Sequence, residues 1–130
     1  MNRRQLIGTL PAAAILPVPA VSAPVRDPMI DYAEGWLSAN EAWIEAVKQP
    51  DGGNFDSPAC LHFDRIKDEM EVLMRDNPIR TAAGFSAFCR FMAEDNNISD
   101  ETCDFPQLRR WQVVKMIEWS EAQALIGSAA

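Results

Sequence analysis

Residues 27–48 read DPMIDYAEGWLSANEAWIEAVK, and this stretch decides the fold. Asp27 is a favourable N-cap residue, and Pro28 stands at the first helical position, where a missing N–H costs nothing. Apolar side chains then recur every three or four residues, which is the period of one face of an α-helix. The pattern stops at the turn-forming residues 49–53, QPDGG. The stretch therefore predicts an amphipathic helix over residues 28–48.

Working outward from this helix, the sequence predicts three more helices and no strand. The alternation of β-branched and polar residues that marks a strand is absent. A second cap-then-proline start, Ser57-Pro58, follows a loop of about nine residues, a length that suits an antiparallel helical hairpin. The further helices are expected over residues 58–76, from after Thr81 to about residue 95, and from about Pro106 to Ile126.

These elements predict an all-α fold, a small antiparallel helical bundle of about four helices built on the N-terminal helical hairpin. Residues 24–130 form its single domain. The first helix has its apolar face on Met29, Ile30, Ala33, Trp36, Leu37, Trp43, Ile44 and Val47, with Asn40 among them. The buried stripe of the second helix is expected at Ala59, Phe63, Ile66, Met70 and Leu73, and that of the third at Phe85, Phe88, Cys89 and Met92.

Composition limits the function classes. The chain has 130 residues, which suits one domain, and 12 Lys and Arg residues stand against 19 Asp and Glu residues. The net charge of −7 argues against a nucleic-acid partner, since phosphates require a basic surface. No uninterrupted apolar run approaches 20 residues, so no transmembrane span is expected.

Residues 1–23 differ from the rest of the chain. Arg3 and Arg4 precede an uncharged, largely apolar stretch that begins at Leu6, and no acidic residue occurs before Asp27. This is the layout of an export signal, and the paired arginines are typical of a twin-arginine leader read by the export machinery. Small residues at Ala20 and Ala23 mark two candidate cleavage sites.

We therefore expect residues 1–23 to be disordered or cleaved and the protein to be periplasmic or otherwise exported. Cleavage would change the net charge from −7 to −9, because Arg3 and Arg4 leave with no acidic residue. The alternative is a cytoplasmic protein that keeps these residues as an uncleaved tail.

Three cysteines and one histidine are the residues most suited to metal or redox chemistry. Cys60 and His62 stand two positions apart, near opposite sides of a helix, and the usual zinc-binding cysteine pair is missing. No metal site is therefore expected. In an exported protein a disulfide could form, and Cys89 with Cys103 is the pair we favour.

Three side chains are singled out as candidate contacts. Asn40 lies on the apolar face of the first helix, where a polar amide needs a hydrogen-bond partner, either within the fold or on a ligand. The fourth helix is apolar over much of its circumference, so it is either central or a docking surface, with Trp111 and Trp119 as candidate interaction residues.

No phosphate-binding loop or catalytic motif is present, so neither an enzyme nor a cofactor is expected.

Residues 2–7 read NRRQLI and residues 77–84 read NPIRTAAG. With the predicted hairpin, these segments resemble short uncharacterised bacterial and prophage-associated α-helical proteins that carry a twin-arginine-type leader. The leader departs from the full motif, which has Ser or Thr before the arginines and Phe after the spacer, where this chain has Asn2 and Leu6. The resemblance implies an architecture and no catalytic residues.

Three functions remain open from the sequence. The first is an exported accessory or protein-interaction module without catalytic activity, with a protein partner or self-association. The second is a periplasmic ligand- or metal-binding module. The third is a cytoplasmic, prophage-associated protein.

Overall fold

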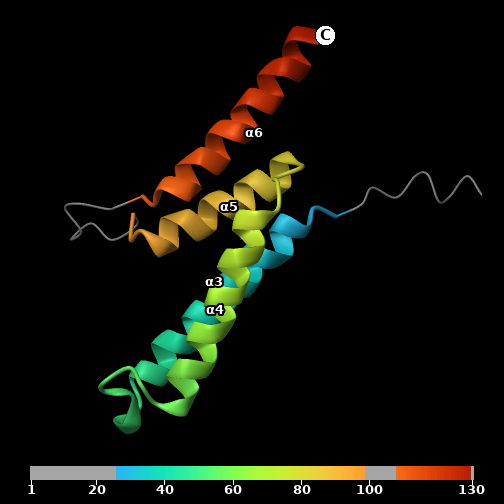
Figure 1. The fold of residues 1–130 in the computed structure, drawn as a ribbon. Helices are drawn as coiled ribbons and strands as arrows, with labels where there is room; N and C mark the ends of the chain where they lie inside the picture. The colour runs from blue at the N-terminus through green and yellow to red at the C-terminus, as the bar shows by residue number, and fades with distance from the viewer. Residues whose placement is uncertain (1–25, 99–107, 130) are drawn as a thin grey trace, which may run out of the picture.

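The fold is known from a computed structural model, which describes residues 26–98 and 108–129. In chain order the elements are α3 (Pro28–Val47), the 3-10 turn η1 (Pro50–Gly52), α4 (Pro58–Asp76), α5 (Ala82–Asp95) and α6 (Arg110–Ala129). Helices α3 and α4 form a hairpin, α5 lies across one end of it, and α6 runs past α5 with its C-terminal end projecting from the body (Figure 1). The described residues contain no strand, and the predicted all-α bundle is confirmed.

The first three long helices begin where the sequence predicts. The side chains of Asp27, Ser57 and Thr81 each accept a hydrogen bond from a backbone N–H in the first turn of the helix that follows. Helices α3 and α5 end within one residue of the expected position, and α4 ends at Asp76 as expected. Local capping chemistry therefore sets these bounds.

The loop between α3 and α4 folds back closely onto the end of α3. Gly52 is buried there, and a Cβ atom at this position would lie 2.9 Å from Cα of Val47. Only glycine permits this approach, which gives a reason for the glycine-rich sequence of the turn.

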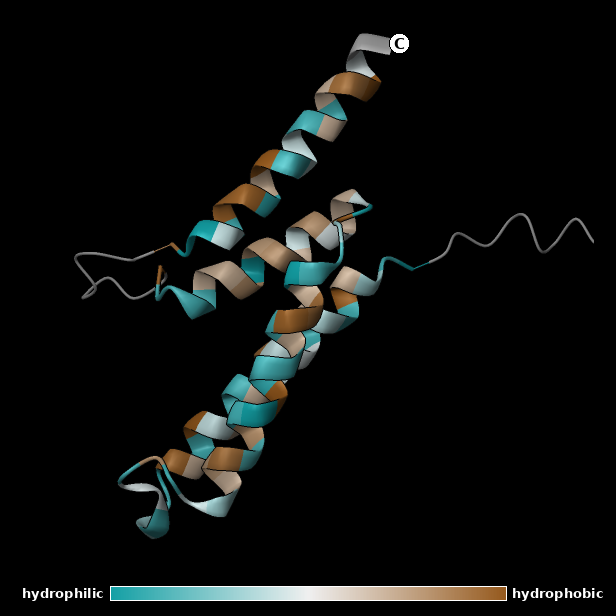
Figure 2. Cartoon of the chain, viewed as in Figure 1, coloured by the Kyte–Doolittle hydropathy of each residue, from teal (hydrophilic) through white to brown (hydrophobic). Residues whose placement is uncertain are grey.

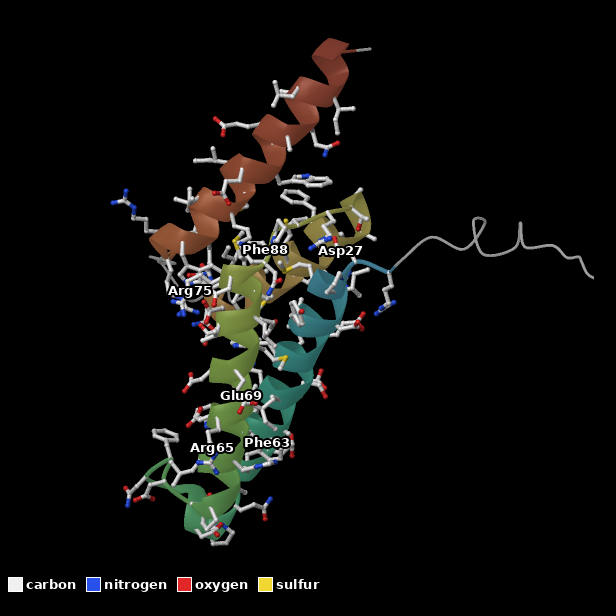
Figure 3. All side chains as sticks on the ribbon, turned by 45° about the vertical axis from the view of Figure 1, so that its right-hand side comes forward. Asp27, Phe63, Arg65, Glu69, Arg75 and Phe88 are labelled. Carbon is white, nitrogen blue, oxygen red and sulfur yellow. The ribbon has the colours of Figure 1, made fainter. Side chains whose placement is uncertain are left out.

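The core lies where α3, α4 and α5 meet. Trp36 of α3 meets Phe91 of α5 edge to face, with 4.9 Å between ring centroids. Phe88, labelled in Figure 3, lies between the hairpin and α6 and is fully buried. The buried core residues are Met29, Ala33, Trp36, Met74, Ile79, Ala87, Phe88, Phe91 and Met92.

The predicted buried stripes need correction. On α4 the fully buried residues are Cys60 and Met74, whereas Ala59 is exposed, because α3 packs against a stripe rotated by one residue. On α5 the prediction omitted Phe91, which is fully buried. On α3 the predicted core residue Ile44 is 41% exposed.

A buried carboxylate joins the beginnings of α3 and α5. Asp27, only 2% exposed, accepts hydrogen bonds from the backbone N–H groups of Met29, Arg80 and Thr81 and from the Thr81 hydroxyl, at 2.9–3.0 Å. Figure 3 shows Asp27 at the first turn of α3, beside the start of α5. Gly84 lies directly against this carboxylate, since a Cβ atom there would sit 2.6 Å from Cγ of Asp27.

The prediction that the last helix starts near Pro106 is wrong. Leu108 and Arg109 lie outside the helix, which begins at Arg110 and runs to Ala129, beyond the expected end at Ile126. The physical reason is a side-chain cap: the Gln112 side chain accepts a hydrogen bond from the Arg109 N–H, the reach-back contact of a capping box.

None of the helices in the two described ranges combines the length and the apolar character needed to cross a membrane.

Candidate functional site

The N-terminal turns of α6 are fixed to the body by a buried amide. The Gln112 side chain is 0% exposed, and its oxygen accepts from the Arg109 N–H and from Nδ2 of Asn96 at 3.0 Å. The amide nitrogen of Gln112, Nε2, donates to the Asp95 carboxylate at 2.7 Å. One side chain thus joins the start of α6 to the end of α5, with its buried polar atoms satisfied.

Arg109 adds a second connection beside this amide. Its guanidinium donates to the carboxylates of Asp95 on α5 and Glu71 on α4, and it lies 5.6 Å from the centre of the Trp111 ring. Burial alone would lower the pKa of Arg109, but hydrogen bonds and charge from Glu71 and Asp95 outweigh it and raise the pKa. Arg109 therefore stays cationic and joins three helices.

Lys115 connects α6 to the C-terminus of α4. Its ammonium is nearly buried and donates to the backbone carbonyls of Arg75, at 2.9 Å, and Asn77. Burial lowers the pKa of Lys115, and the negative charges of Glu118 and Asp76 only partly offset this effect. A lysine at the last carbonyls of a helix also meets the negative end of the helix dipole.

The two tryptophans predicted for an interaction surface lie on the inner side of α6. Trp111 packs against Phe88 and Phe91, and Trp119 stacks on Phe85 with 5.8 Å between ring centroids. Both are half-buried. In the structure they hold α6 against α5, so a docking surface on this helix depends on other residues.

The outer side of α6 carries exposed apolar side chains. Val114 is 41% exposed, Ile117 49% and Leu125 73%, and every residue from 120 to 127 is exposed. Apolar segments recur along the whole length of α6, including the part that projects past the other helices (Figure 2). Large apolar side chains that stay exposed along a helix form a surface suited to a partner.

A groove accompanies this surface. It has a volume of about 510 Å³, lies where α6 meets the end of α4, and is lined by Arg75, Arg110, Trp111, Val114, Lys115 and Glu118. Arg75 is labelled in Figure 3 at this end of α4. The groove combines apolar walls with a charged rim, as protein interaction sites do.

Asn40 lies in a second polar feature, which we call the Lys67 hollow. The Asn40 side-chain oxygen accepts a hydrogen bond from Nζ of Lys67 at 2.9 Å, and this ammonium lies 5.0 Å from the Trp36 ring and 4.9 Å from the Trp43 ring. The indole N–H groups of both tryptophans are buried and have no partner among the described residues. The hollow measures about 350 Å³ and is lined by Trp36, Asn40, Trp43, Ile44, Lys67, Glu94, Asp95 and Asn97.

The remaining predicted site residues lie partly outside the described chain. The leader residues Arg3, Arg4, Leu6, Ala20 and Ala23 and the cysteine Cys103 are all outside it. Cys89 is half-buried on α5, and burial raises the pKa of its thiol. Because Cys103 lies outside the described residues, the Cys89–Cys103 disulfide stays a prediction. Within residues 26–98 and 108–129, no cluster of three or more histidine, cysteine or acidic side chains could hold a metal ion.

Comparison of the chain with protein-family models, with curated proteins and with solved structures finds no match.

Sequence reasoning missed the residues that attach α6 to the body. Neither Gln112 nor Lys115 was singled out from the sequence, yet both are buried. No local signal marks Gln112, because the residue three positions before it, Arg109, is not one of the usual N-cap residue types. Nothing local marks Lys115, whose partners lie about 40 positions away, on Arg75 and Asn77.

Proposed function

We propose that this protein is a non-catalytic interaction module and that α6 is the helix on which a protein partner docks. The observation that carries the proposal is the asymmetry of α6. Gln112, Lys115 and the two tryptophans fix its inner side, while Val114, Ile117 and Leu125 stay exposed on the other side. Exposed large apolar side chains on a helix anchored in this way are what a partner would cover.

The polar groups of the described residues support a structural role better than a catalytic one. Asp27, Gln112, Arg109 and Lys115 each bond to backbone or side-chain groups that hold helices together. Each is committed to contacts within the fold, so none is placed to act on a substrate.

Site-specific photo-crosslinking tests the docking surface. A photoreactive phenylalanine is placed at Ile117 of the full chain, and in a matched control at Leu61, which is 46% exposed on α4, away from α6. We expect protein adducts from position 117 in the native host and none from position 61. An absence of adducts at position 117, with the chain folded and present, would contradict the proposal.

Export is the second part of the proposal, and residues 1–23 support it through Arg3, Arg4 and the uncharged stretch from Leu6. The resemblance to leader-bearing prophage-associated proteins points the same way. The N-terminal mass of the protein from its host tests this part. A chain beginning at Val21 or Pro24 is expected, whereas an intact N-terminus in the cytoplasm would support the uncleaved alternative.

Binding of a small molecule in the Lys67 hollow is a second candidate function. The specific observation is a local excess of donors: two buried indole N–H groups without a partner stand beside an ammonium that bonds to Asn40. A ligand with hydrogen-bond acceptors, such as a carboxylate, would suit this site. Native mass spectrometry of the chain from its host should then show bound mass that a Lys67→Met variant loses; the bare chain mass in both would count against this function.

A further inference from the structure

We infer that the partner of α6 is a second copy of this chain, with the two α6 helices antiparallel and Arg110 of each copy against Glu121 of the other. This inference rests on the proposed docking role of α6 and names its occupant.

The contact is built on four residues that share one side of α6. Arg110, Val114, Ile117 and Glu121 are separated by four, three and four positions, so they fall within about 60° of one another around the helix axis. This spacing is typical of the contact line between two packed helices. All four are exposed, and we call them the α6 contact line.

The charges at its ends are available for contacts between molecules. Arg110 and Glu121 form no ion pair with any other residue in the described ranges, in contrast to Arg109 beside them, which pairs with Glu71 and Asp95. The cation lies at one end of the contact line and the carboxylate at the other. The line is therefore charged in opposite senses at its two ends, with apolar residues between.

This arrangement selects the direction of pairing. In an antiparallel pair, a two-fold axis midway between Val114 and Ile117 places each Val114 opposite the other copy's Ile117. The same axis places each Arg110 opposite the other copy's Glu121, so both ends of the contact are complementary in charge. A parallel pair would instead place Arg110 against Arg110 and Glu121 against Glu121, which is repulsive.

The groove beside the contact line fits the same arrangement. It is lined in part by Arg110 and Val114 and lies along the edge of the contact line that faces α4. Side chains of a second helix laid along the line have room to enter it. A single helix pair buries less surface than a standard stable interface, so we expect weak dimers, with a dissociation constant of roughly 1–100 μM.

Analytical ultracentrifugation of the full chain over a wide concentration range tests the pairing. We expect Arg110→Glu alone, or Glu121→Arg alone, to weaken the dimer at least about tenfold, because each places like charges opposite one another. The double variant, Arg110→Glu with Glu121→Arg, restores opposite charges and should restore the dimer. The matched control is Arg65→Glu, an exposed arginine on α4 (labelled in Figure 3) whose substitution changes the net charge equally.

The outcomes separate this inference from the proposed function. Circular dichroism first establishes that each variant keeps its helical content. A wild-type chain that stays monomeric at all concentrations, or a double variant no better than the single ones, overturns the antiparallel pair. Adducts at position 117 that contain another protein, with none at twice the chain mass, would overturn the second copy as partner and leave the docking role standing.

Discussion

Gly84→Ala tests most directly the packing of α5 against the Asp27 carboxylate at the start of α3. In an ordinary helix interior this change stabilises by up to about 1 kcal/mol, because alanine has the higher helix propensity. Here the added Cβ atom would lie 2.6 Å from Cγ of Asp27, much closer than real Cβ contacts. The carboxylate would have to move, and it is the acceptor that joins the start of α3 to the start of α5.

The expected loss of stability follows from the hydrogen bonds that a displaced Asp27 carboxylate would lose. The Asp27 oxygen nearest Gly84 accepts three hydrogen bonds, from the Arg80 N–H, the Thr81 N–H and the Thr81 hydroxyl. Hydrogen bonds to a charged group contribute about 1.5–3 kcal/mol each, so losing all three would cost about 4.5–9 kcal/mol. A shift of the first turn of α5 would recover part of this, and we expect a net loss of about 2–3 kcal/mol after the gain in propensity.

Chemical unfolding of a double-mutant cycle measures this coupling. In an Asp27→Ala background the obstructing carboxylate is gone and only the Cβ atom of residue 27 stays close, at 3.3 Å, so Gly84→Ala should become about neutral. Gly127→Ala is the matched control, since nothing lies within 4 Å of a Cβ atom there. A Gly84→Ala variant that stabilises the wild-type chain, or that costs the same in both backgrounds, would refute the reasoning.

Three further predictions concern stability. Burial would raise the pKa of Asp27, but the hydrogen bonds it accepts outweigh this and hold the pKa below its ordinary value. The ionised Asp27 therefore stabilises the fold above about pH 4, and this contribution is lost as the pH falls through the lowered pKa. When the free energy of unfolding is measured at decreasing pH, the difference in that free energy between the wild type and Asp27→Asn should become smaller. Lys115→Met removes the donor to the last carbonyls of α4 and should lower the free energy of unfolding in urea by about 1–3 kcal/mol. The control Lys48→Met removes an exposed ion pair and should change it by under about 0.5 kcal/mol. Equal effects of the two substitutions would contradict the capping role of Lys115. Asn40→Ala leaves the Lys67 ammonium without its acceptor and should lower the thermal midpoint, with a cost of about 1–2 kcal/mol, while an unchanged midpoint would argue against this contact.

The bounds of α3, α4 and α5 could be predicted because capping is local. Asp27, Ser57 and Thr81 each stand within three residues of the N–H that they cap. Which side of each helix is buried could be predicted less accurately. On α4 the apolar residues permit two neighbouring stripes, and only the position of α3 decides that Cys60 is buried and Ala59 exposed.

In the candidate site, too, local patterns identified some residues but not their partners. Asn40 could be singled out because it interrupts an apolar face, but its partner Lys67 stands 27 positions away. Gln112 and Lys115 are polar residues in a sequence that otherwise favours burial, and only the approach of α4 and α5 supplies their acceptors. Polar contacts between distant helices depend on the tertiary arrangement, which no local pattern encodes.

The one-sided attachment of α6 has a consequence for local unfolding. Its inner contacts end near Trp119, and residues 120–127 rely on hydrogen bonds within their own helix, which is marginal for a short segment in water. Backbone amides in these last turns should exchange with deuterium through fraying, while those between Gln112 and Trp119 exchange only with larger openings. The molecule therefore has two levels of protection along one continuous helix, and the boundary between them lies within a single turn of Trp119.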